Sequence, residues 1–360
     1  MRRTLTMAAA VATLLLPAGP LPGAGAGGGA QAAVGRWSAR EAQAFWTAER
    51  MASAAPLPPA EPAPPAGTLP AEAPSGPVAE PGEPVPPSTP TPAAPSSAPA
   101  TAPEPAPVRR PAAALPAAAA PGVGQNFDGI PVVGRMFVVK GAGSYFCTAS
   151  VVASPGRNLV LSAAHCLLGA DTQRVAFVPR YTRAKPQPYG MFPVLRDAAG
   201  RSRIWIDPRY RSRGVDRAAG LDVAFAQVGP NAAGVPVQNV VGGNRLVTGA
   251  GYAHPQVTLI GYPSSAARPR RCVNRTTKFT SRDARIPGSF LRIDCTGYPG
   301  GTSGGPFLVR YDARTRTGDV VGVIGGWKTG GDTADTSYSS YFGSDIRKLY
   351  AKAVAGAKAG

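Results

Sequence analysis

The chain has 360 residues and a formal net charge of +18, with 38 lysines and arginines against 20 acidic residues. Such a charge attracts nucleic acids, anionic surfaces and acidic substrates alike, but no aromatic stacking platform or known nucleic-acid-binding motif accompanies it. We therefore expect no nucleic-acid partner and favour retention on an anionic cell surface. Apart from a short N-terminal run, no apolar stretch approaches the length of a bilayer, so no membrane span is expected.

The first 121 residues differ in kind from the rest. A basic start at 1–3, an apolar run at 7–16 and small residues at 24–26 are typical of a secretory signal peptide, which we assign to residues 1–30. From 56 to 121, 23 of 66 residues are proline, which excludes helix and sheet and indicates an extended linker. We interpret residues 31–121 as a pro-segment removed on maturation. The precursor would be a zymogen whose mature chain starts between 117 and 126.

A short helix is expected near the start of this pro-segment. Ser38 and Glu41 have capping-box spacing, and Phe45, Trp46 and Met51 follow at helical intervals. Two interpretations stay open: a marginal helix isolated in the leader, or a helix that docks on the following domain.

Residues 122–360 are long enough for one domain with a sizeable core. Apolar and alternating runs between Gly, Pro and Asp turns indicate an all-β domain. One helix is expected after Ser344, where Ile346, Leu349 and Ala353 share a stripe. The expected strands lie at 132–140, 144–153, 158–163, 174–181, 203–207, 222–228, 256–262, 289–295, 305–311, 319–327 and 339–343.

The most informative stretch is GTSGGP at 301–306. Small neighbours let the backbone bend sharply, so that the Ser303 hydroxyl stands clear and the N–H groups of Gly301 and Ser303 can form an oxyanion hole. A glycine-rich turn with a serine is most often an ordinary loop. The assignment therefore depends on a base and a carboxylate elsewhere in the chain.

The base must be one of two histidines, because a pKa near ~6.5 suits histidine to proton transfer at neutral pH. His165 ends the apolar run 159–165, which delivers its imidazole at a strand end. His254 lies in the loop signal GYAHP and is more simply a solvated loop residue. We therefore assign His165 as the base.

A carboxylate is needed to fix the tautomer of that histidine. Asp222 opens the apolar strand 222–228, where a buried acid could reach inward. Asp207 and Asp216 are the alternatives, but both lie in an arginine-rich loop and are more simply solvated turn residues.

Three blocks resemble the His, Asp and Ser blocks of chymotrypsin-like (trypsin-fold) serine peptidases, in the same chain order. They are LSAAHC at 161–166, LDVAFAQV at 221–228 and GGTSGGP at 300–306. The resemblance covers about 122–360 and is greatest to the secreted bacterial branch with V8-type and actinobacterial members. It implies two packed antiparallel six-stranded β-barrels with a C-terminal α-helix, the triad His165, Asp222 and Ser303, and no cofactor.

The resemblance also suggests a pairing for the four cysteines. Cys147 with Cys166 would reproduce the family's bridge beside the histidine, which leaves Cys272 with Cys295, although sequence alone does not choose among three connectivities. Export favours oxidation. No cysteines or histidines have usable metal-ligand spacing, so we expect no metal site.

Substrate contacts are also implied by the resemblance. Substrate would pair with 323–327 as an added strand, although an ordinary core strand explains this stretch equally well. Gly297 stands where trypsin-like members carry an acid, so cleavage after Arg or Lys is not expected. A pocket for acidic side chains would need Lys328 or Arg292, both more simply surface charges. The expected substrate-binding residues are Gly297, Tyr298, Gly325, Gly326 and Trp327.

The sequence thus predicts a secreted, monomeric serine endopeptidase that cleaves protein or peptide substrates through an acyl-enzyme intermediate. The alternative is a catalytically silent binding protein of the same fold, retained on anionic surfaces.

Overall fold

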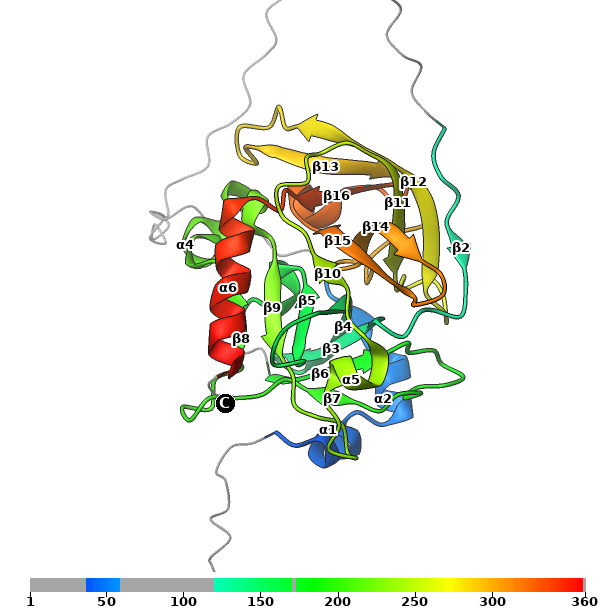
Figure 1. Ribbon diagram of the computed structural model, residues 1–360, viewed down its shortest axis with the longest axis vertical. Helices are drawn as coiled ribbons and strands as arrows, with labels where there is room; N and C mark the ends of the chain where they lie inside the picture. The colour runs from blue at the N-terminus through cyan, green and yellow to red at the C-terminus, as the bar shows by residue number, and fades with distance from the viewer. Residues whose placement is uncertain (1–36, 59–119, 170–172, 359–360) are drawn as a thin grey trace, which may run out of the picture.

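The computed structural model describes residues 37–58, 120–169 and 173–358. The expected signal peptide and most of the proline-rich linker lie outside the described residues, so the predicted processing stays a prediction. Two curled, mostly antiparallel sheets pack together, and helix α6 (Ser344–Lys358) lies along the first of them (Figure 1). The prediction of an all-β fold with a C-terminal helix is confirmed.

The first sheet has the strand order β7-β6-β3-β4-β5-β9-β8, with β1 paired to β4. Its middle strands β3 and β4 are buried along most of their length, because side chains from both faces pack against other elements. The strands are β1 (Ala55–Pro56), β3 (Val133–Lys140), β4 (Gly143–Val152), β5 (Leu159–Ser162), β6 (Gln173–Pro179), β7 (Phe192–Pro193), β8 (Ile204–Ile206) and β9 (Ala224–Gln227).

The second sheet has the order β10-β15-β14-β11-β12-β13-β16, with β2 paired to β12. Each sheet thus holds six strands of three or more residues, as the resemblance implied, and two strands of two residues. The strands are β2 (Gln125–Asn126), β10 (Arg245–Leu246), β11 (His254–Gly261), β12 (Arg270–Thr280), β13 (Ser289–Asp294), β14 (Pro306–Asp312), β15 (Thr317–Val323) and β16 (Thr336–Ser340).

Several elements of the domain differ from expectation. Helix α5 (Val237–Val241) was not predicted, and the strand expected at 319–327 ends at Val323, before a short 3-10 helix at Trp327–Gly330. Strand β12 was not predicted, because its side chains are mostly polar and only Cys272 and Thr276 are buried along it. Helix α4 (Pro208–Arg217) occupies the stretch expected to be a loop, with Asp207 as its N-cap accepting from the Arg209 N–H. An Asp-Pro pair suits the first turn of a helix as well as it suits a turn.

The leader forms two short helices, α1 (Ala39–Phe45) and α2 (Ala48–Ser53). The capping box between Ser38 and Glu41 is present as predicted. Trp46 and Met51 are fully buried against the first sheet, so these helices dock on the domain and are not isolated. Among the described helices, none is long and apolar enough to cross a bilayer.

The predicted disulfide pairing is confirmed. Cys147 on β4 is bonded to Cys166, and Cys272 on β12 is bonded to Cys295, with Cα separations of 6.3 and 6.1 Å. Each sheet therefore carries one covalent crosslink of its own.

Candidate active site

His165 is carried by a short helical turn at the end of a buried strand. The four residues of β5 are all buried, and the chain turns at Ala163 into α3 (Ala164–Leu167). The His165 side chain is only 3% exposed. The apolar run 159–165 therefore delivers the histidine at a strand end, as the sequence predicted.

Asp222 lies beside this histidine and is fully buried. Its Oδ2 is 2.8 Å from His165 Nδ1, and its Oδ1 accepts the His165 backbone N–H at 2.9 Å. Oδ2 also accepts the Gly326 N–H at 2.9 Å. These three contacts hold the carboxylate and the ring in one fixed orientation.

The environment of Asp222 keeps the carboxylate ionised. Burial alone would raise its pKa, but the neighbouring His165 and the hydrogen bonds from His165 and Gly326 lower the pKa below its ordinary value. Glycine is required at 325, because a Cβ there would lie 2.9 Å from Asp222 Oδ2. The carboxylate is thus enclosed by backbone from both sheets.

Ser303 lies in the glycine turn before β14 and is half-buried. Its carbonyl accepts the Thr148 N–H at 2.8 Å, which ties the turn to β4 of the first sheet. Gly304 has a φ of +81°, and a Cβ there would overlap with Thr148 O and Ser162 Oγ. Glycine is therefore needed for both conformation and space.

Some backbone N–H groups around Ser303 donate hydrogen bonds and others do not. Gly304 N–H donates to Ile324 O at 2.7 Å, and Gly305 N–H donates to Thr302 O at 2.9 Å. Within the described residues, the N–H groups of Gly301 and Ser303 donate no hydrogen bond. Two free amides in one turn are what an oxyanion hole requires.

His165 and Asp222 are in direct contact. Among the described residues, Ser303 Oγ makes no hydrogen bond to the imidazole. The serine turn and the histidine are linked through β4: Thr148 binds the Ser303 carbonyl, and the adjacent Cys147 is bonded to Cys166. Catalytic hydrogen bonds are often loose before substrate arrives.

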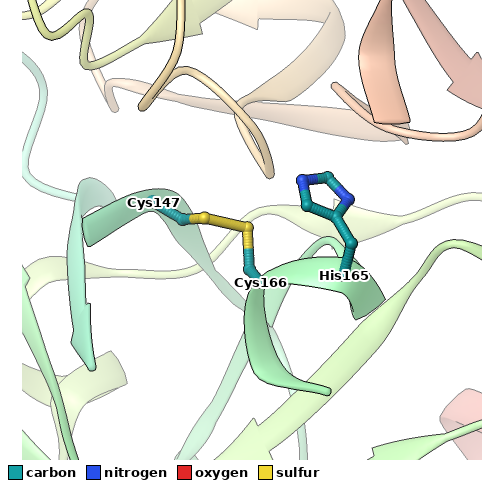
Figure 2. A group of neighbouring side chains, drawn as sticks. All are labelled: Cys147, His165 and Cys166. Atoms are coloured by element: carbon teal, nitrogen blue, oxygen red, sulfur yellow. A yellow bond between two sulfur atoms is a disulfide. The ribbon is translucent and has the colours of Figure 1, made fainter. Parts of the chain in front are cut away.

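Cys147, His165 and Cys166 bring their donor atoms within 4.8 Å of one another. Figure 2 shows the imidazole beside the disulfide that joins the two cysteines. Because both sulfur atoms are used in the disulfide, they cannot act as thiolate ligands. The cluster is therefore a crosslink beside the histidine and not a metal centre.

The residues expected to bind substrate lie around the second sheet, but not all of them face a free edge. Tyr298 is buried and its hydroxyl donates to Leu259 O at 2.9 Å. Gly325 N–H donates to Tyr338 O, and Gly326 N–H is used by Asp222. In the described part of the chain, the Gly325 carbonyl accepts nothing and is free to pair with a substrate.

Gly297 and Trp327 have well-defined surroundings. Gly297 N–H donates to Asp335 at 3.1 Å, and its carbonyl accepts from Arg270 at 3.1 Å. Trp327 is half-buried and packs against Phe279 and Tyr338. The cation nearest Gly297 is thus Arg270, which lies on the strand β12 that the sequence did not predict.

The two cations named as candidates for an acidic pocket both have carboxylate partners. Arg292 pairs with Asp294 at 2.9 Å, and Lys328 pairs with Asp332. Their interpretation as surface charges is the simpler one on this geometry.

Sequence reasoning overlooked Thr148 and Tyr210. Thr148 Oγ1 donates to Gly301 O at 2.9 Å and accepts the Tyr262 N–H at 2.8 Å, so it holds the serine turn. Tyr210 on α4 is buried near Asp222; burial and then the Asp222 charge raise its pKa well above the usual value. The signal for Thr148 was its place directly after Cys147.

His254, the histidine not chosen as the base, opens strand β11 and does not lie in a loop. Its Nε2 is buried and has no hydrogen-bond partner in the described structure. The two histidines are thus on different sheets, and only His165 contacts an aspartate in the described residues.

Comparison with known proteins gives a consistent result. Residues 147–323 match the family model described as the trypsin-like peptidase domain, a segment that contains His165, Asp222 and Ser303. Residues 147–323 are thus a trypsin-like peptidase domain. A search of curated proteins found no match to the chain.

Two solved structures of proteases have the same fold. The protease Anisep from Arthrobacter nicotinovorans is 23% identical, with a TM-score of 0.54 over 64% of this chain and 99% of that one. The thermostable serine protease AL20 from an extremophilic microorganism is 22% identical, with a TM-score of 0.52 over 62% and 97%. At these identities the likeness establishes the fold.

Proposed function

We propose that this chain is an exported serine endopeptidase that uses Ser303 as nucleophile, His165 as general base and Asp222 as the orienting carboxylate. The observation that carries the proposal is the buried His165–Asp222 pair, joined at 2.8 Å and bonded again through the histidine backbone. A buried acid held in this way serves to fix one tautomer and to stabilise the imidazolium.

The reaction follows from these positions. Ser303 Oγ attacks the peptide carbonyl while His165 takes the hydroxyl proton, and the carbonyl oxygen gains its charge against the Gly301 and Ser303 amides. The protonated His165 then gives that proton to the leaving amine, and an acyl-enzyme remains. Water, deprotonated by His165, attacks the ester and releases the acid and Ser303.

Export and activation complete the proposal. Two disulfides suit an oxidising compartment, and a leader ahead of the domain suits a zymogen. The charge of +18 favours retention on an anionic cell surface. A single copy is the proposed active form, because all three catalytic side chains come from one chain.

A serine-directed phosphonate tests the mechanism. We expect stoichiometric labelling of Ser303, detected by peptide mass spectrometry, and no label in Ser303→Ala. Ser337→Ala is a suitable control, because Ser337 is buried on β16 and has no role in the reaction. Mature, folded, disulfide-bonded protein that takes no label would support the alternative, a catalytically silent binding protein of the same fold.

The residue preference of the enzyme follows from digestion of a denatured proteome. Because Gly297 replaces an acid in the expected pocket, we expect few cuts after Arg or Lys. A majority of cuts after those residues would contradict this part of the proposal.

A further inference from the structure

The leader segment 37–58 makes two different kinds of contact with the domain. Helices α1 and α2 are its anchor, because Ala42, Trp46 and Met51 have no exposed surface. The Trp46 indole donates to Arg174 O at 2.8 Å, and its ring lies 5.2 Å from that of Phe137. Burying a large aromatic side chain in this way stabilises the docked state by about 2–3 kcal/mol.

The end of the segment, residues 55–57, is its tip. Ala55 and Pro56 form strand β1, which pairs in parallel with Tyr145 and Phe146 of β4. The Leu57 N–H donates to the Phe146 carbonyl at 3.2 Å. Ala55 is exposed and the next two residues are only half-buried, so the tip is held far more weakly than the anchor.

The tip lies beside the serine turn. A Cβ placed on Gly300 would be 3.3 Å from Pro56 Cβ. The Phe146 ring occupies the space in front of Gly301, whose added Cβ would lie 2.5 Å from the ring. Two residues further along β4, Thr148 binds the carbonyl of Ser303. The strand edge that receives β1 is therefore continuous with the proposed oxyanion hole.

A substrate passing Ser303 has to leave the site in two directions. The free Gly325 carbonyl offers pairing for its acyl side on the second sheet. The leaving-amine side then runs toward the first sheet, which carries His165, the proton donor to that amine. The exposed edge on that side is β4 at Tyr145 and Phe146, where residues 55–57 already pair.

We infer that the tip, residues 55–57, occupies the surface that would bind the leaving-amine side of a peptide substrate, as a displaceable intramolecular strand. The inference rests on the proposed function. It makes the leader a selective barrier: substrates that extend beyond the scissile bond must displace the tip, while the anchor stays docked. Substrates with a small leaving group do not meet it. Strand addition at a sheet edge is a general mode of peptide recognition.

The test uses the full chain and removes one hydrogen bond of the tip. Leu57→Pro deletes the N–H that donates to Phe146, in a stretch where proline neighbours suit the change. The matched control Leu57→Ala keeps the N–H and shortens the side chain. Two substrates share one acyl part: a p-nitroanilide, and a peptide with three further residues after the scissile bond.

For Leu57→Pro we expect kcat/KM on the extended peptide to rise about five- to tenfold, the value of one hydrogen bond, with less than a twofold change on the anilide. Leu57→Ala is expected to show a smaller rise. Equal changes on both substrates, or no change on either, would overturn the inference.

A second readout does not depend on turnover. In Leu57→Pro, amide hydrogen exchange is expected to speed up at Ala54 and Ala55 and in 143–148, while 39–53 keeps its protection. Faster exchange throughout 39–53 would show that tip and anchor move together and would overturn the inference. Absence of turnover and of phosphonate labelling in every variant would instead refute the proposed function, whatever the exchange pattern.

Discussion

The two sheets hold their parts of the candidate site by different means. On the first sheet, His165 and Asp222 are fixed by side-chain contacts, with a buried carboxylate that accepts three hydrogen bonds. On the second sheet, the serine turn is shaped by its backbone, through glycines whose positive φ values and missing Cβ atoms no other residue supplies, and Thr148 of β4 holds it in place. The residue types of the His165–Asp222 pair are therefore determined by side-chain chemistry, and those of the serine turn by backbone conformation.

The largest effect is expected from removing the carboxylate on the first sheet. Asp222→Asn keeps the volume but holds the wrong imidazole tautomer, so kcat should fall by about 10⁴-fold with little change in KM. Asp216→Asn is the control, because Asp216 lies on α4 and was one of the two competing candidates. Steady-state kinetics on the anilide measures both, with circular dichroism to confirm folding. A loss below tenfold would exclude Asp222 from the role proposed here.

A second prediction tests the backbone conformation of the serine turn. Gly304→Ala combines a positive φ with overlap against Thr148 and Ser162, so the free energy of unfolding should fall by about 4 kcal/mol. Gly200→Ala is a matched control, since Gly200 also has a positive φ, of +75°, but no atom within 4 Å of its added Cβ.

The control should cost only about 1 kcal/mol, the strain of a left-handed residue alone. Urea unfolding followed by tryptophan fluorescence compares the two. Equal losses would mean that the contact between the serine turn and β4 contributes nothing beyond backbone strain.

The two disulfides separate stability from activity. Their sequence separations are 19 and 23 residues, so removing either should cost a similar amount, about 3 kcal/mol. Only Cys147–Cys166 joins β4 to the turn that carries His165. Replacing this pair by alanine should lower kcat about tenfold at temperatures where the protein is folded. Replacing Cys272–Cys295 should leave kcat within twofold. Equal losses of kcat in the two variants would contradict this distinction.

The sequence was most informative where the signal is local, within a short stretch of the chain. Periodicity located most strands, and the resemblance gave the cysteine pairing, because apolar alternation and family blocks are local signals. Strand β12 was missed because its outward side chains are polar and charged, so its pairing with β11 and β13 decides its structure. Helix α4 was missed because Asp-Pro starts both turns and helices.

Side-chain contacts between distant segments could not be predicted in detail. The capping box at Ser38 is local and was predictable. The docking of Trp46 on β3 was not, because its contact Phe137 lies 91 positions further along the chain. The roles of Thr148 and Arg270 likewise depend on which strands become neighbours. These contacts depend on the tertiary arrangement, which a local pattern does not encode.

The smallest predicted effect concerns a second buried charge, which contrasts with Asp222. Arg135 on β3 is 4% exposed and makes no ion pair in the described structure; its guanidinium lies 3.8 Å from the Phe146 ring centroid and 4.6 Å from that of Tyr181. Burial lowers its pKa to about 10, so it remains charged at neutral pH.

Cation–π contacts offset only part of the cost of burying such a charge. Arg135→Met, which fills similar space without charge, should therefore raise the free energy of unfolding by about 1 kcal/mol. Arg135→Lys should lower it by a similar amount, since an ammonium stacks less well on aromatic rings and is more strongly hydrated. Thermal unfolding of the three proteins measures both changes. A methionine variant less stable than the parent would mean that the aromatic cage compensates the Arg135 charge as fully as hydrogen bonds compensate that of Asp222.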